Sequence, residues 1–169
     1  MYAIVKDGAI TQTATTVQKL FPNTSFPSGP NTDFLTENNV KDVVNGEQKN
    51  RTYYFVSPGN LELVDGVPTQ KYTNTAKVLN DVTEDGVTTP GLKTNMINKV
   101  KINAGQLLAK TDWMVIRKYE RDVAIPSATA TYRAAVITEC TRLESAIAGA
   151  GDVDALETVM NAQNWPTES

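Results

Sequence analysis

Residues 92–110 read LKTNMINKVKINAGQLLAK, and the apolar positions in this stretch recur at intervals of three or four. That spacing places them on one face of an α-helix. The face comprises Met96, Ile97, Val100, Ala104, Leu107 and Leu108. We therefore predict a helix from about residue 92 to 110, followed by further helices.

The helical pattern continues toward the C-terminus. Thr111 or Asp112 is a suitable N-cap for a second helix that runs to about Asp122, and the Ile125-Pro126-Ser127 corner separates it from a third. The third helix is predicted from about residue 128 to 148, and its expected apolar side comprises Tyr132, Val136, Cys140, Leu143 and Ile147. Asp152 then caps a short last helix.

Residues before 92 show β-type patterns and turn signals instead. Asp7-Gly8 and Asp65-Gly66 each separate two strand-like runs, as expected for hairpins, and Asn45-Gly46 is a further turn signal. The proline-rich stretch from Phe21 to Pro30 is predicted as an ordered loop or extended arm. We expect an α+β fold, in which a small N-terminal antiparallel β module (1–80) and a linker (81–91) precede a C-terminal helical module (92–169).

Composition narrows the class of protein. The chain has 169 residues, a net charge of −3 and no stripe of basic residues, so we expect no nucleic-acid partner. The N-terminal residues lack the apolar core of a signal peptide, and no apolar run approaches the roughly 20 residues of a membrane span. We therefore expect no membrane partner and synthesis in the cytoplasm of the cell that makes it.

The residues that usually carry chemistry are scarce. The chain has no histidine, which removes the commonest general base and the commonest metal ligand. Its single cysteine, Cys140, falls within a helix on or beside the apolar side and is expected to be a packed thiol. No phosphate-binding glycine motif occurs, although the nineteen acidic residues leave a glycosidase-like carboxylate pair open. We predict no catalytic residue, no metal site and no cofactor.

Candidate working parts are therefore contact surfaces. Trp113, Arg117 and Tyr119 are residue types enriched at binding hot spots and could form an interface anchor; alternatively, they belong to a solvated helical face. Tyr54 and Trp165 allow the same two interpretations. In a strand, alternation would place Tyr54 on the opposite side from Tyr53 and Phe55.

Two parts of the chain resemble small proteins of tailed bacteriophages, of a type common in phages of marine bacteria. At the N-terminus the similar residues are MYAIVKDG (1–8) and LFPNTSFP (20–27). Toward the C-terminus they are Leu107-Leu108-Ala109, Thr111-Asp112-Trp113, Arg117, Glu120, Ile125-Pro126, Tyr132-Arg133 and Trp165-Pro166. The second set is also similar to the helical tail of tail fibre assembly proteins.

The resemblance implies a virion structural protein of the tail, baseplate or fibre region, located in the virion and made in the host cytoplasm. Its expected partners are other phage structural proteins, together with further copies of itself in a homo-oligomer. An alternative is a tail fibre assembly chaperone that is absent from the mature particle. A more distant alternative is a hydrolase acting on cell-surface glycan.

Overall fold

The computed structural model describes residues 1–167 and has an α+β fold, with small sheets first and helices after them, as predicted. The chain divides into two compact units, Met1–Thr75 and the part from Ala76 onward. The elements of the first unit are β1 (Tyr2–Lys6), β2 (Ala9–Ala14), α1 (Val17–Leu20), α2 (Thr32–Glu37), β3 (Val40–Asp42), β4 (Val44–Asn45), β5 (Tyr54–Val64) and β6 (Val67–Ala76). Those of the second are β7 (Val82–Glu84), β8 (Val87–Thr89), α3 (Leu92–Ala109), α4 (Asp112–Arg121), α5 (Ser127–Gly149) and α6 (Val153–Asn161).

The first sheet has the order β2-β1-β3, and both of its pairings are antiparallel. The Asp7-Gly8 turn joins β1 to β2, and both turn residues have positive φ, as two-residue hairpin turns require. Two short helices that were not predicted, α1 and α2, flank the proline-rich loop, and each begins at a side-chain cap, Thr16 and Asn31 respectively.

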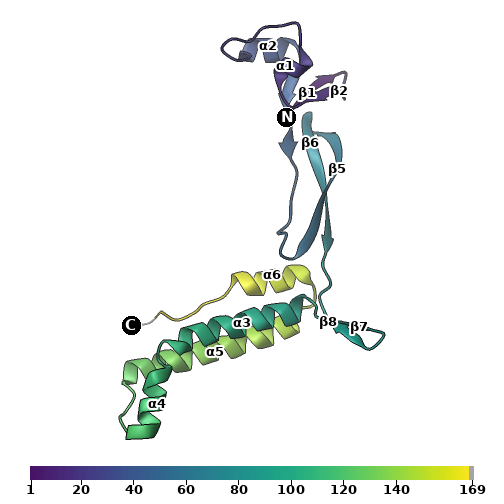
Figure 1. The fold of residues 1–169 in the computed structure, drawn as a ribbon. Helices are drawn as coiled ribbons and strands as arrows, with labels where there is room; N and C mark the ends of the chain where they lie inside the picture. The colour runs from purple at the N-terminus through teal and green to yellow at the C-terminus, as the bar shows by residue number, and fades with distance from the viewer. Residues whose placement is uncertain (168–169) are drawn as a thin grey trace. The chain divides into compact units, whose positions relative to one another are not determined.

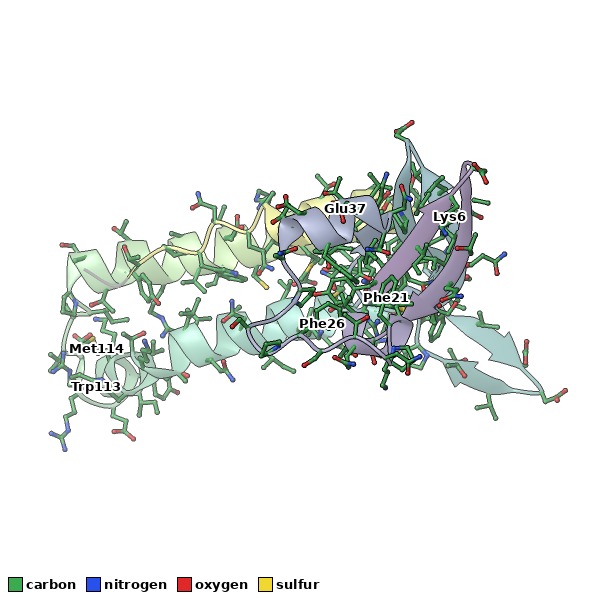
Figure 2. The ribbon with its side chains drawn as sticks, turned by 90° about the horizontal axis from the view of Figure 1, so that it is seen from above. Lys6, Phe21, Phe26, Glu37, Trp113 and Met114 are labelled. Atoms are coloured by element: carbon green, nitrogen blue, oxygen red, sulfur yellow. The ribbon has the colours of Figure 1, made fainter. Side chains whose placement is uncertain are left out.

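An aromatic cluster fills the interior next to this sheet. Phe34 of α2 makes edge-on contacts with Phe21 and Phe26, with ring centroids 5.0 Å apart in each case. These rings pack against buried Ile4, Val17 and Val40. Figure 2 labels Phe21 and Phe26, which come from the loop that the prolines predicted. The loop therefore contributes to the core of the first unit.

A second sheet, of order β4-β6-β5, is dominated by a long two-stranded ribbon (Figure 1). β5 and β6 have 11 and 10 residues and are joined by the predicted Asp65-Gly66 turn. The Asn45-Gly46 signal does not form a hairpin. Instead, β4 pairs in parallel with β6, and the Gly46 N–H donates to the Gln70 carbonyl at 2.9 Å. The module is thus antiparallel except for this two-residue pairing.

The segment predicted as a linker is structured. Residues 82–89 form the antiparallel hairpin β7–β8, with both residues of the Asp85-Gly86 turn at positive φ. Its connection to α3 is held by hydrogen bonds: Leu92 N donates to Val78 O, and Gly91 N donates to the Asp81 carboxylate at 2.8 Å. The bond from Gly91 lowers the pKa of Asp81. These bonds satisfy amide groups at the start of α3 that would otherwise lack partners.

The helical unit is built on α3 packed against α5, with α6 packed on α5 (Figure 1). The predicted helix boundaries agree with the structure to within about two residues, and Asp152 accepts the Ala155 N–H as the N-cap of α6. On α5 Cys140 is half-buried and packs against the core cluster, and its neighbour Glu139 is buried. The last two residues of the predicted helical module lie outside the described residues.

Candidate protein interface on α4

α4 follows α3 at the end of the α3–α5 pair that lies away from β7 and β8 (Figure 1). Its start is fastened to α5 by Arg133. The Arg133 Nη1 donates to the Leu108 carbonyl at 2.9 Å and to the Thr111 hydroxyl at 2.7 Å, and lies 2.9 Å from the Asp112 carboxylate. Thr111 is buried beneath this contact. Arg133 thereby fixes where α4 begins.

The body of α4 is exposed. None of its ten residues is buried, although the helix contains several large apolar side chains. The exposed fractions are 52% for Trp113, 57% for Ile116 and 93% for Tyr119, and Val115 is exposed as well, as is Val123 just beyond the end of the helix. Figure 2 shows Trp113 with its neighbour Met114 at this end of the helical unit. Such a concentration of exposed aromatic and aliphatic side chains is typical of a binding surface.

Helical geometry groups these side chains into a face. Trp113, Ile116 and Glu120 are spaced at i, i+3 and i+7, so they lie along one stripe of the helix. Tyr119 flanks the stripe on one side and Arg117 on the other. We call these five residues the α4 face.

The cation on the α4 face stacks on its neighbour. The Arg117 guanidinium lies over the Trp113 ring, 4.8 Å from the ring centroid. Its Nε is shielded from water and donates to no acceptor among the described residues. A buried donor without an acceptor is costly to the free energy of folding. The structure thus brings together the predicted anchor residues Trp113, Arg117 and Tyr119.

Tyr54 is not on this surface. It begins β5 and is buried, and its hydroxyl accepts from Lys49 Nζ at 3.3 Å, with the same amine 4.6 Å from the ring centroid. The predicted alternation holds for Tyr54, which is buried, and Phe55, which is 64% exposed, but it is wrong for Tyr53, which is buried as well. The reason is that Tyr53 precedes the strand in a turn, so the strand pattern does not apply to it.

Trp165 is half-buried within the helical unit. Its ring packs against the cluster of Ala104, Tyr132 and Val136, and its Nε1 donates to the Gln163 side chain at 2.8 Å. The ring therefore serves to fasten the C-terminal segment to α3 and α5.

The thiol, the acidic side chains and the cavities of the described residues show no arrangement suited to catalysis or metal binding. Cys140 packs beside the cluster named above and donates to Glu144 at 3.3 Å, and burial followed by that carboxylate raises the pKa of the thiol. A raised pKa disfavours the nucleophilic thiolate. The depression of about 370 Å³ around Phe26 has no acid, base or thiol among its described lining residues. Within residues 1–167, no group of three Cys, Asp or Glu side chains is placed to hold a metal ion.

The contact made by Arg133 can be tested directly. We expect Arg133→Lys to destabilise the start of α4 by about 1 kcal/mol, because one ammonium cannot reproduce the contacts of a planar guanidinium. Hydrogen exchange across residues 111–121 should speed up in the variant. Arg121→Lys, at an exposed position of the same helix, is the control and should leave exchange there unchanged.

Sequence reasoning missed some of the surface. Ile116 and Glu120 were not singled out, although the i, i+3 spacing from Trp113 was available as a signal. Of the aromatic triplet, Tyr53 was assigned to the wrong side, because it is buried together with Tyr54.

Among residues 1–167, no helix combines the length and apolarity needed to cross a bilayer. No family model, curated protein or solved structure matches the chain.

Proposed function

We propose that the protein is a non-enzymatic structural component of a tailed-phage particle, which binds other virion proteins in the tail, baseplate or fibre region. The observation that carries the proposal is the exposed α4 face, whose Trp, Tyr and Arg side chains are the types that dominate binding energy at protein interfaces. The sequence resemblance supplies the phage context.

The β5–β6 ribbon adds a second surface suited to contacts. A two-stranded ribbon is marginally stable in water unless other elements cover it. Here the third strand, β4, pairs over only two residues, and most residues of the ribbon are exposed. A partner protein that packs along the ribbon would supply the missing cover.

The test is mass spectrometry of purified particles from the phage that encodes the chain. We expect its peptides at a fixed ratio to those of a tail protein. Absence of the chain from intact particles would contradict a structural role.

The alternative is a tail fibre assembly chaperone that leaves before maturation, which an exposed aromatic helix face also suits. For that role the chain would be absent from particles. Co-expression would then raise the soluble yield of the fibre, and replacing Trp113 and Tyr119 with serine would abolish the gain. Unchanged yield with and without the wild-type chain would exclude the chaperone role.

A further inference from the structure

Within the helical unit, no described element covers the α4 face. A ten-residue helix with no buried side chain is marginal in water, because helices of this length depend on packing for their stability. Trp113, Ile116 and Tyr119 are each more than half exposed. A second surface that packs on this face would both bury these residues and stabilise the helix.

The charges of α4 indicate which surface that is. The helix and its C-cap hold three acids and three bases, so their formal charges cancel. Asp112 and Asp122 are engaged within the chain, by Arg133 and Lys118 respectively. Glu120 forms no ion pair among the described residues. One face therefore carries a carboxylate, Glu120, and a guanidinium, Arg117, neither of which forms an ion pair among the described residues.

A face that holds both halves of an ion pair is complementary to a copy of itself. In an antiparallel contact between two α4 helices, with the two-fold axis passing between residues 118 and 119, Arg117 of one copy lies opposite Glu120 of the other. The pair is then made twice, as in every isologous interface. The same axis sets Trp113 of one copy opposite Ala124 of the other, and both residues are exposed in the single chain.

We propose that two copies of this chain associate through antiparallel, two-fold contact of their α4 faces, with the Arg117 guanidinium of each paired to the Glu120 carboxylate of the other. The inference does not rest on the phage assignment. Since α4 is only about 15 Å long, the interface is small, and association at roughly 10–100 µM protein is expected.

The experiment is sedimentation equilibrium of the full chain and of two charge reversals, Glu120→Arg and Arg117→Glu, over a dilution series that reaches roughly 500 µM. The wild type should pass from an 18.4 kDa species to one of twice that mass. Each reversal alone sets like charges opposite each other and should weaken association at least about tenfold, or 1.4 kcal/mol. Glu84→Arg makes the same charge change on the exposed β7 and should behave as the wild type.

A mixture of the two variants, Glu120→Arg and Arg117→Glu, tests directly whether residues 117 and 120 face each other. In the mixed pair, the carboxylate introduced at position 117 of one chain meets the guanidinium introduced at position 120 of the other, and the native Glu120 meets the native Arg117. Association should therefore return to the wild-type level in the mixture. The proposal is overturned by a wild type that stays at 18.4 kDa throughout, by a trimer, by reversals that leave association unchanged, or by a mixture that fails to restore it. Circular dichroism of each variant confirms that it is folded.

Discussion

Leu143→Ala is expected to lower the free energy of unfolding of the helical unit by about 2–5 kcal/mol. The Leu143 side chain is completely buried in α5, as are those of Val136 and Ile147 on the same side of the helix. Truncation removes buried apolar surface and leaves a cavity that neighbouring helices fill only in part. Small domains have only about 5–15 kcal/mol of stability in total, so the loss is a large fraction.

Urea unfolding followed by far-UV circular dichroism measures this effect, because the helices supply most of the signal. The matched control is Ile137→Ala, in the same helix but 54% exposed. It should change the free energy of unfolding by about 0.5 kcal/mol or less. Similar losses in the two variants would contradict the packing of α5 described above.

The helical half was largely predictable because its signals are local. Met96, Val100 and Ala104 follow a 3.6-residue period and are all buried, and Asp152 carries a cap signature that the structure confirms. In the β half, Asp-Gly turns predicted two hairpins correctly. The same dipeptide at Asp85-Gly86 marked the third hairpin, which was predicted as a linker. Its flanking strands have only three residues each, too short to show alternation.

Other features depend on contacts that no local pattern records. The parallel pairing of β4 joins residues 44–45 to 69–70, across a separation that turn signals do not describe. The α4 face was predictable in part, since Trp113, Arg117 and Tyr119 were identified by residue type. Both interpretations placed these side chains at the surface, and Trp113 and Tyr119 are exposed. The Arg133 contacts that fix the start of α4 were not predicted.

Glu139 is an acid whose burial the apolar pattern of α5 did not predict. It occupies the buried side of α5, where an apolar residue was expected, and it is 8% exposed. Its two oxygens accept from Nε and Nη2 of Arg142, each at 2.7 Å, and one also accepts the backbone N–H of Asn164 at 2.8 Å. A carboxylate is tolerated there because these donors replace water.

Glu139→Gln should therefore lower the free energy of unfolding of the helical unit by about 1.5–3 kcal/mol at neutral pH. We expect a value near the lower limit because the Arg142 side chain is half-exposed. The amide keeps the size of the side chain but loses the charge-assisted bonds. The bonds from Arg142, helped by that from Asn164 and opposed by burial, lower the pKa of Glu139 in the folded chain. The folded state consequently favours the ionised form more than the unfolded state does.

The sign of the pH dependence follows from that lowered pKa. The advantage of the wild type over Glu139→Gln is fully present above the unfolded pKa of about 4.3, and it is lost as the pH falls through the lower folded value. Urea unfolding, measured at neutral and at acid pH, should show a difference in free energy of unfolding between the wild type and Glu139→Gln at neutral pH. This difference should disappear at acid pH. Glu84→Gln, on the exposed β7, should show no difference from the wild type at either pH. A difference of equal size at both would mean that Glu139 does not act through its charge.

Release of the C-terminal segment gives a second readout of the same contact. Asn164 is bonded to Glu139 and is followed by Trp165, whose ring packs on the α3–α5 cluster. The chain has two tryptophans, so Trp113→Phe leaves Trp165 as the sole reporter. In that background, Glu139→Gln should move Trp165 emission to longer wavelength while the helical circular dichroism signal stays in place. If the helices unfold together with the segment, Glu139 supports α5 itself. If the emission wavelength does not change, the bond from Asn164 to Glu139 is not needed to hold the segment in place.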